Sequence, residues 1–128
     1  MARRVNRALI REGRVEIQHG TVSALPFPDE TFDLVTCFET SYFWPDLPRA
    51  LGEIRRVTKP GGTLLIANEA YKDERFAKRN RLWIAWSGIE HLHAPQEYLA
   101  FLTEAGYVGV ETTTLPEKNW IAALARRP

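Results

Sequence analysis

Apolar positions along the chain follow two different periods, and the change from one to the other divides the sequence into helices and strands. Apolar residues at helical spacing predict helical segments at 2–13, 47–62 and 94–106, and the mixture of charged and aromatic residues at 71–86 predicts an exposed helix or a lid. Short β-branched or apolar runs bounded by glycine or proline predict strands at 14–20, 32–38, 63–70, 107–115 and 119–126.

Two of these segments carry the clearest patterns. Leu47, Leu51, Ile54 and Val57 share one helix face, and the helical segment ends at Pro60 and a Gly61-Gly62 turn. The run at 32–38 is almost continuously apolar, which is typical of a parallel strand buried on both faces.

The order of the elements predicts the fold class. Helix, strand, helix and strand alternate, and the chain then ends with a helix and two strands joined as a hairpin. This order predicts an α/β domain of three layers, with an antiparallel strand pair at the C-terminal end. A length of 128 residues allows one domain with a core and not two.

Composition and charge limit the classes of binding partner that the sequence predicts. Hydrophobic residues make up 45% and charged residues 26% of the chain, and the net charge of +1 gives no electrostatic footprint for nucleic acid. No apolar run reaches the length of a membrane span, so we expect no membrane partner and a cytoplasmic location. The single cysteine, Cys37, excludes an internal disulfide framework, and inside an apolar strand it is expected to act as a small buried hydrophobe.

Three motifs in series identify a family resemblance. The segments "LPFPDETFDLV", "EIRRVTKPGGTLLI" and "FLTEAGYVGVE" follow one another at a spacing that resembles the class I S-adenosylmethionine-dependent methyltransferases, of the Methyltransferase type 11 kind. The resemblance covers nearly the whole chain. It implies a Rossmann-like three-layer α/β/α sheet, S-adenosylmethionine as cofactor and methyl transfer to a small-molecule acceptor.

One part of the family pattern is absent from this sequence. The glycine-rich cofactor loop, G-x-G-x-G, does not occur in it, nor does the acidic residue that binds the ribose hydroxyls. Both are expected to precede residue 1, so 1–128 is interpreted as the C-terminal portion of a methyltransferase domain, shortened at its N-terminus. Whether this shortened chain binds the cofactor is left open.

The resemblance also implies which residues meet the cofactor. Gly20, Thr21 and Val22 correspond to the adenine contacts, with Thr21 standing where the family commonly has an aspartate. The stretch Cys37, Phe38 and Glu39 corresponds to the contacts with the methionine portion. Pro26 and Pro28 stiffen the elbow that presents Phe27, and such a loop is expected beside the ligand.

Aromatic and histidine side chains supply the candidate acceptor site. The substrate-binding candidates are Tyr42, Phe43, Trp44, Trp83, Trp86, His91 and His93. Aromatic faces attract a sulfonium cation, although plain packing under a loop explains the same residues equally well. The two histidines could serve in a substrate lid or as a general base, and no set of cysteines or carboxylates beside them completes a metal site.

Three other interpretations stay open. The missing loop favours a non-catalytic dimeric interaction module derived from a methyltransferase. A nicotinamide-dependent oxidoreductase on a Rossmann sheet is another alternative, but the C-terminal strand pair argues against it. The charged residues at 72–81 indicate a solvated helix face or, alternatively, an RNA contact.

The missing strands also predict an assembly. In the resembled fold they lie between the strand at 14–18 and the strand at 32–38, so their loss leaves the latter as an apolar edge. That edge could be covered by residues 14–18 of the same chain or by a second chain. Because Pro26 and Pro28 stiffen the intervening loop, we expect the second solution, a homodimer.

Overall fold

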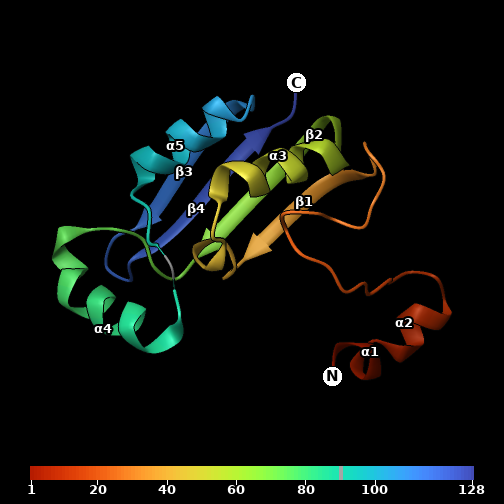
Figure 1. Ribbon diagram of the computed structural model, residues 1–128, viewed down its shortest axis with the longest axis horizontal. Helices are drawn as coiled ribbons and strands as arrows, with labels where there is room; N and C mark the ends of the chain where they lie inside the picture. The colour runs from red at the N-terminus through yellow and green to blue at the C-terminus, as the bar shows by residue number, and fades with distance from the viewer. Residues whose placement is uncertain (90) are drawn as a thin grey trace.

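A mixed α/β structure is formed by the chain in the computed structural model, which describes residues 1–89 and 91–128 (Figure 1). The helices are α1 (Ala2–Val5), α2 (Arg7–Arg11), α3 (Leu47–Val57), α4 (Ala77–Ser87) and α5 (Pro95–Glu104), with short 3-10 turns η1 (Ser41–Phe43) and η2 (Glu74–Phe76). The strands are β1 (Phe32–Phe38), β2 (Thr58–Asn68), β3 (Val108–Leu115) and β4 (Trp120–Arg126).

These strands form one sheet in the order β1-β2-β4-β3. β1 and β2 are parallel, with Cys37 opposite Ile66, whereas β4 runs antiparallel to both β2 and β3. The parallel pair needs a crossover, which α3 supplies, and the antiparallel pair needs only the turn between Leu115 and Trp120. The predicted α/β class and the C-terminal antiparallel strand pair are therefore confirmed.

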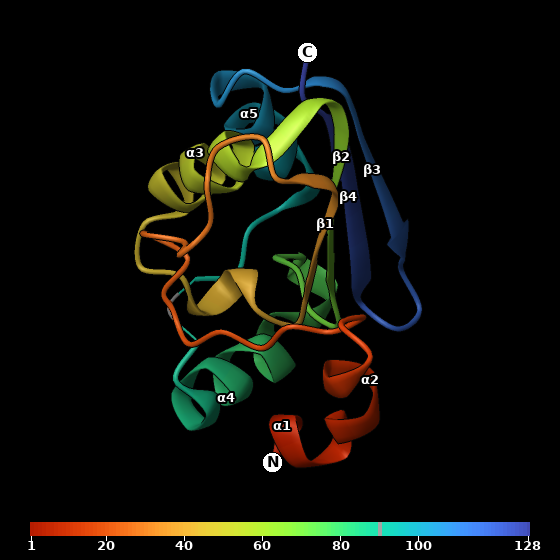
Figure 2. The same ribbon diagram turned by 90° about the vertical axis from the view of Figure 1, so that its right-hand side faces the viewer.

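The core lies between one face of this sheet and the helices α3 and α5, which cover it side by side (Figure 2). Strand residues that alternate along β2 and β4 point into it, and the apolar stripe of α3 packs over them. Its fully enclosed members include Leu51, Ile54, Leu64, Ile66, Tyr98, Leu102 and Ala125.

The opposite face of the sheet is left uncovered by the described residues. Leu34 and Phe38 of β1 are 57% and 59% exposed, and Leu124 of β4 is 41% exposed. The prediction that the strand at 32–38 is buried on both faces is thus wrong for one face. Since α3 and α5 lie on the same side, two of the three expected layers are present in this part of the chain.

The N-terminal segment departs most from expectation. Residues 14–20 form no strand, so that prediction is wrong, and they run away from the sheet towards α1 and α2 (Figure 1). Val15 and Ile17 are only half-buried, and Arg3 donates to the Ile17 carbonyl oxygen at 2.6 Å. A strand is stable only when a neighbouring strand satisfies its backbone groups, and none of the described strands pairs with this segment.

The remaining helices follow the sequence with small shifts. The helical segment at 2–13 divides at Asn6 into α1 and α2, and Gly13 ends it with a φ of +69°. Helix α3 ends at Val57, before Pro60, because the chain at Thr58 already turns extended to pair with Phe32. Of the exposed helix or lid expected at 71–86, the structure shows the helix, α4, with Asn80 as its buried residue.

The open edge of β1 generates a testable prediction of a homodimer. The Glu39 N–H donates to the Ala67 oxygen of β2 at 3.0 Å. Because successive strand residues point their N–H groups to opposite sides, the N–H of Thr36, three residues earlier, points to the open edge. We expect two chains to pair through this edge, and a Thr36→Pro substitution to yield monomers by removing that donor. Thr36→Val, which keeps the N–H, serves as the matched control.

Light scattering coupled to gel filtration measures the outcome. The unsubstituted chain and the valine variant should elute at twice the 14.7 kDa chain mass, and the proline variant at the chain mass. A monodisperse monomer of the unsubstituted chain at micromolar concentration contradicts the dimer, and a dimeric proline variant contradicts the edge pairing.

Candidate cofactor and acceptor site

Two acidic residues, Glu39 and Glu69, meet where the parallel strands β1 and β2 end, through the Glu69 backbone N–H and the Glu39 carboxylate. Glu39 directly follows β1 and adopts a φ of +55°, a left-handed conformation that costs a non-glycine residue energy. Its carboxylate accepts hydrogen bonds from the Tyr42 hydroxyl and from the Glu69 N–H. The strained backbone is thus held by contacts from both neighbouring segments, and the Glu39 side chain has a fixed position at the carboxyl edge of the sheet.

A buried polar network lies beside these carboxylates. The Asn68 amide donates to the Ser41 hydroxyl at 2.7 Å and to the Tyr98 hydroxyl at 2.9 Å, and the two hydroxyls are 3.1 Å apart. Burial raises the pKa of the Tyr98 phenol, so this hydroxyl stays protonated at neutral pH. The network ties η1 and α5 to the end of β2.

An apolar cavity of about 380 Å³ opens at the same end of the sheet. Its lining comes from the ends of β1 and β2 and from β3 and β4, together with Glu39 and Glu69, which are its charged residues. Its large apolar side chains include Phe38, Leu115 and Trp120. The cavity therefore combines apolar walls with negative charge, an arrangement that suits a cation bearing an apolar part.

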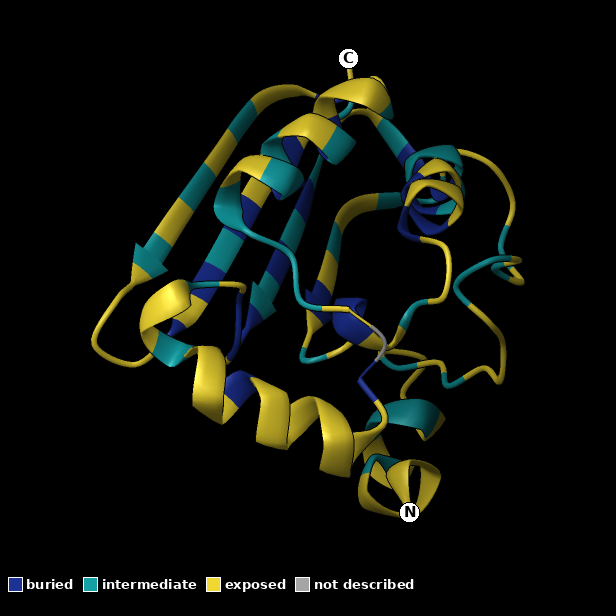
Figure 3. Ribbon diagram, turned by 60° about the vertical axis from the view of Figure 1, so that its left-hand side comes forward, coloured by how far each residue is buried: buried dark blue, intermediate teal, exposed yellow. Residues whose placement is uncertain are grey.

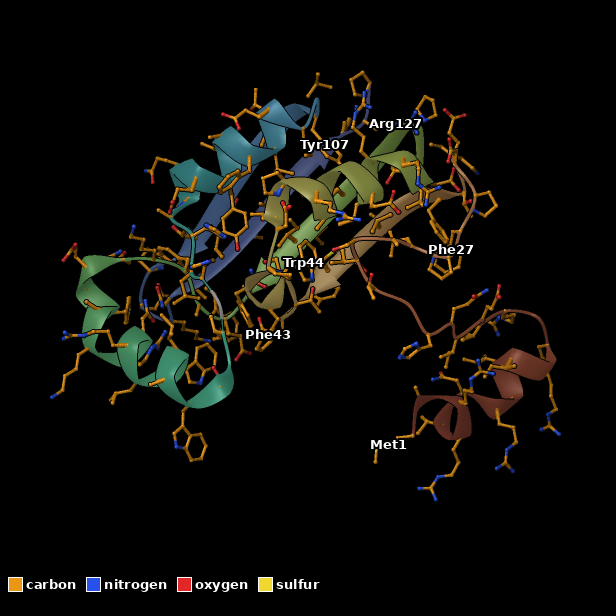
Figure 4. The ribbon with its side chains drawn as sticks, in the orientation of Figure 1. Met1, Phe27, Phe43, Trp44, Tyr107 and Arg127 are labelled. Carbon is orange, nitrogen blue, oxygen red and sulfur yellow. The ribbon has the colours of Figure 1, made fainter. Side chains whose placement is uncertain are left out.

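Tyr42, which donates to Glu39, has two other predicted aromatic residues around its ring. The Tyr42 ring packs edge-on against Phe43 at 4.8 Å between centroids and lies 6.3 Å from the Trp83 ring. Burial, followed by the hydrogen bond to Glu39, raises the pKa of the Tyr42 phenol. Figure 4 shows Phe43 and Trp44 at the carboxyl end of β1, where Trp44 packs partly against the core.

The other predicted acceptor residues are separated. Trp86 is 93% exposed and points into solvent. His93 packs edge-on against Tyr98 and Phe101 at 5.7 and 5.2 Å, and burial lowers the pKa of its imidazole. His91, whose ring lies 6.3 Å from that of His93, borders a second cavity of about 330 Å³ under α4.

The predicted adenine contacts lie in the loop before β1. A Cβ added to Gly20 would come within 2.8 Å of the Pro26 ring. The absence of a side chain at Gly20 therefore allows the backbone at this position to pack directly against Pro26. Thr21 forms an isolated bridge with Ala24, and Val22 packs partly against the core. Within the described residues, no hydrogen bond joins 20–22 to 37–39.

Cys37 lies on the core face of β1. Its side chain is 8% exposed, and burial raises the pKa of the thiol to about 11. Among the three residues predicted for the methionine portion, only Phe38 and Glu39 line the 380 Å³ cavity.

The proline elbow has a different role from the one expected. Arg56 of α3 donates to the carbonyl oxygens of Phe27 at 2.9 Å and Leu25 at 3.1 Å, and to Asp29 at 2.8 Å. Glu53 accepts from the Leu25 N–H at 2.9 Å and pairs with Arg56. These contacts clamp the elbow onto α3, and Figure 4 shows Phe27 at the opposite end of β1 from Phe43, away from the carboxyl edge.

Several site residues were missed from the sequence. Glu69 and Asn68 could have been found, because the rule that ligands bind at the carboxyl ends of parallel strands applies to β2 as it does to β1. Tyr98 and Trp120 come from distant segments, and no local signal marks either of them.

Comparison with known proteins assigns the family. Residues 1–66 match the family described as methyltransferase domain. The chain belongs to this methyltransferase family. It is 39% identical over 54 residues to the uncharacterized methyltransferase YcgJ of Bacillus subtilis, an alignment that covers 42% of this chain and 21% of that protein.

Two further relatives extend the match over most of the chain. Sterol 24-C-methyltransferase erg-4 of Neurospora crassa is 31% identical over 113 residues, which cover 84% of this chain and 30% of that protein. A SAM-dependent methyltransferase from Thermotoga maritima has the same fold, with a TM-score of 0.76 at 19% identity over 94% of this chain and 68% of that one. The chain spans between about a fifth and somewhat over a half of the length of the curated relatives that it matches.

The clamp between α3 and the elbow predicts a pH-dependent stability. The hydrogen bond from Arg56, followed by that from the Leu25 N–H, lowers the pKa of Glu53 to about 2. Because this folded-state value lies below the unfolded one, the stabilisation is complete above about pH 4.3 and is lost as the pH falls towards 2. A Glu53→Gln variant should lose about 1–3 kcal/mol at pH 7 and progressively less below pH 4.

Urea unfolding at a series of pH values measures this difference. Glu117→Gln, which removes an exposed carboxylate in the β3–β4 turn, is the matched control and should unfold like the unsubstituted chain. A constant gap between the Glu53 variant and the unsubstituted chain from pH 7 to pH 2 contradicts the assignment.

Cys37 generates a second prediction, about reactivity. A buried thiol with a pKa of about 11 carries almost no thiolate at pH 8, so a disulfide reagent should modify the folded chain far more slowly than the chain in denaturant. A reaction as fast in the folded chain as in urea would show that Cys37 is accessible. The colour released by the reagent gives both rates directly.

Proposed function

We propose that this chain supplies the acceptor side and the methionine side of an S-adenosylmethionine-dependent methyltransferase that acts on a small-molecule acceptor. The observation that supports this most directly is the fixed Glu39 carboxylate beside an apolar cavity at the carboxyl end of β1, in a chain of the methyltransferase family. S-adenosylmethionine, when bound, supplies an electrophilic methyl group on a positively charged sulfur.

The residues present fit the cationic part of that cofactor. Glu39 and Glu69 place negative charge at the 380 Å³ cavity, and Phe38 offers aromatic surface to a cation, whereas the Trp120 ring already carries the Lys118 ammonium at 4.8 Å. Glu39 keeps its orientation because Tyr42 and the Glu69 N–H both donate to it. These groups can therefore bind a sulfonium or an amino group without moving, which is what orientation-based catalysis requires.

The proposal needs few proton transfers by side chains of this chain. The raised pKa of Tyr42 keeps its hydroxyl protonated, so it acts as a donor to Glu39 and not as a base. The lowered pKa of His93 leaves its imidazole neutral at pH 7, when it can accept a proton. A base is needed only for an acceptor that loses a proton on methylation; His93 packs against Tyr98 and Phe101 and does not line the 380 Å³ cavity, so it is not placed to serve there.

A second candidate function is the non-catalytic dimeric interaction module. The observation that favours it is the unpaired segment 14–20, which leaves Gly20–Val22 without hydrogen bonds to the carboxyl end of β1 among the described residues. In this case the uncovered sheet face and the open edge of β1 are the surfaces through which the chain binds its partner.

Titration with S-adenosylhomocysteine followed by amide NMR tests the proposal. We expect weak binding, with a dissociation constant of about 0.1 mM or weaker, because only part of the cofactor is contacted. Shift changes should gather at Glu39, Glu69 and the Trp83 indole. They should vanish in a Glu39→Gln variant and persist in the Glu117→Gln control.

The other outcomes are decisive as well. Submicromolar affinity contradicts the interaction module. No shift changes at millimolar ligand overturn the methyltransferase proposal for this chain, and shift changes caused by NADH in a parallel titration would favour the nicotinamide alternative.

A further inference from the structure

Helix α4 ends in an uninterrupted run of exposed apolar residues. All five residues from Leu82 to Trp86 are apolar and exposed, and the exposed fractions reach 67% for Leu82 and 93% for Trp86. Figure 3 shows the helix exposed along nearly its whole length. Single exposed apolar residues are ordinary, but a run of this length on a helix indicates a surface that contacts something else.

The helix is held in this position by a polar clip. The Asn119 amide of the β3–β4 turn donates to the Asn80 oxygen at 3.1 Å, and the Asn80 amide donates to the Tyr71 carbonyl oxygen at 2.9 Å. Asn80 is the buried residue of α4, and Asn119 is fully buried. The clip orients the helix, so its second half projects beyond the carboxyl ends of β1 and β2 (Figure 1).

Basic side chains surround the start of this helix. Lys78, Arg79 and Arg81 lie in its first half, and α4 contains no acidic residue. Arg79 stacks over the Phe76 ring at 4.7 Å, whereas Lys78 and Arg81 form no ion pair among the described residues. Glu74 in the preceding turn offsets part of this charge, so the helix start presents a net positive charge, followed by a projecting apolar tip.

We propose that the tip of α4 inserts into an anionic lipid surface, with Lys78 and Arg81 at the phosphate groups. A projecting convex tip fits a lipid boundary, which needs no matching pocket, and tryptophan favours the interface between headgroups and acyl chains. Each basic residue near an anionic leaflet adds about 1 kcal/mol of attraction. An acidic protein is the alternative occupant, but it would need a groove shaped for this tip.

Surface binding of this kind requires no spanning segment. No helix in the described residues combines the length and the apolar character needed to cross a bilayer. The proposal replaces the expectation of no membrane partner, which rested on that criterion alone. It does not depend on the proposed methyltransferase function, since α4 would bind lipid with or without a cofactor.

Vesicle flotation with the 128-residue chain tests the inference. We expect binding to vesicles of phosphatidylglycerol and phosphatidylcholine, binding about tenfold or more weaker to phosphatidylcholine alone, and loss of binding as salt is raised. Leu82→Ser/Trp86→Ser should weaken binding about tenfold or more through the apolar tip. Lys78→Gln/Arg81→Gln should do so only for the anionic vesicles.

The matched control changes exposed apolar residues elsewhere. Val108→Ser/Leu124→Ser removes two such side chains from the uncovered sheet face and should leave vesicle binding unchanged. Circular dichroism confirms that each variant is folded.

Three results overturn the proposal. They are absence of vesicle binding by the unsubstituted chain, equal binding to both vesicle types, and an equal loss in the sheet-face control. Loss of self-association in the α4 variants without any vesicle binding would assign the tip to a protein interface instead.

Discussion

Parallel pairing between β1 and β2 is the constraint on which the rest of this structure depends. Two parallel strands end at the same edge of the sheet, so the residues that follow them, Glu39 and Glu69, are brought together although 29 positions lie between them in the sequence. The Glu69 N–H then donates to Glu39 and holds it in its left-handed conformation. The same pairing satisfies one edge of β1, and no strand of the described residues pairs with its other edge.

Polar contacts fix the elements that apolar packing leaves free. The sheet and the helices α3 and α5 share an apolar core, but the elbow, η1 and α4 have few buried apolar residues of their own. Arg56 and Glu53 hold the elbow, Asn68 holds η1 and α5, and the amide pair of Asn80 and Asn119 holds α4. Hydrogen bonds are directional, and each of these contacts therefore sets an orientation as well as a distance.

The uncovered face and the exposed tip of α4 have different physical origins. The face consists of alternate strand residues such as Leu34 and Leu124, which would be buried wherever a further layer covers the sheet. The tip consists of consecutive helix residues, of which Trp83 faces the Tyr42 ring while Leu82 and Trp86 are the most exposed. The first surface is shaped for a further layer of polypeptide, and the second is the surface that we propose to meet lipid.

Local patterns in the sequence determined most of the elements. The apolar stripe of Leu47, Leu51, Ile54 and Val57 predicted α3, and the alternating strands near the C-terminus predicted β3 and β4, because these patterns reflect burial against an adjacent layer. The family motifs and the position of Phe38 and Glu39 at a strand end also came from sequence, since strand ends are marked by a local change in pattern.

Only the tertiary structure decided what depends on a distant partner. Residues 14–20 have the composition of a strand, but strand formation needs a neighbour, and the described sheet offers none to this segment. Tyr98, Asn80 and Trp120 acquire their roles from contacts with segments far along the chain, which no local period encodes. The sequence determines which side chains can be buried or can form hydrogen bonds. The arrangement of the sheet determines which of them are buried or bonded in the folded chain.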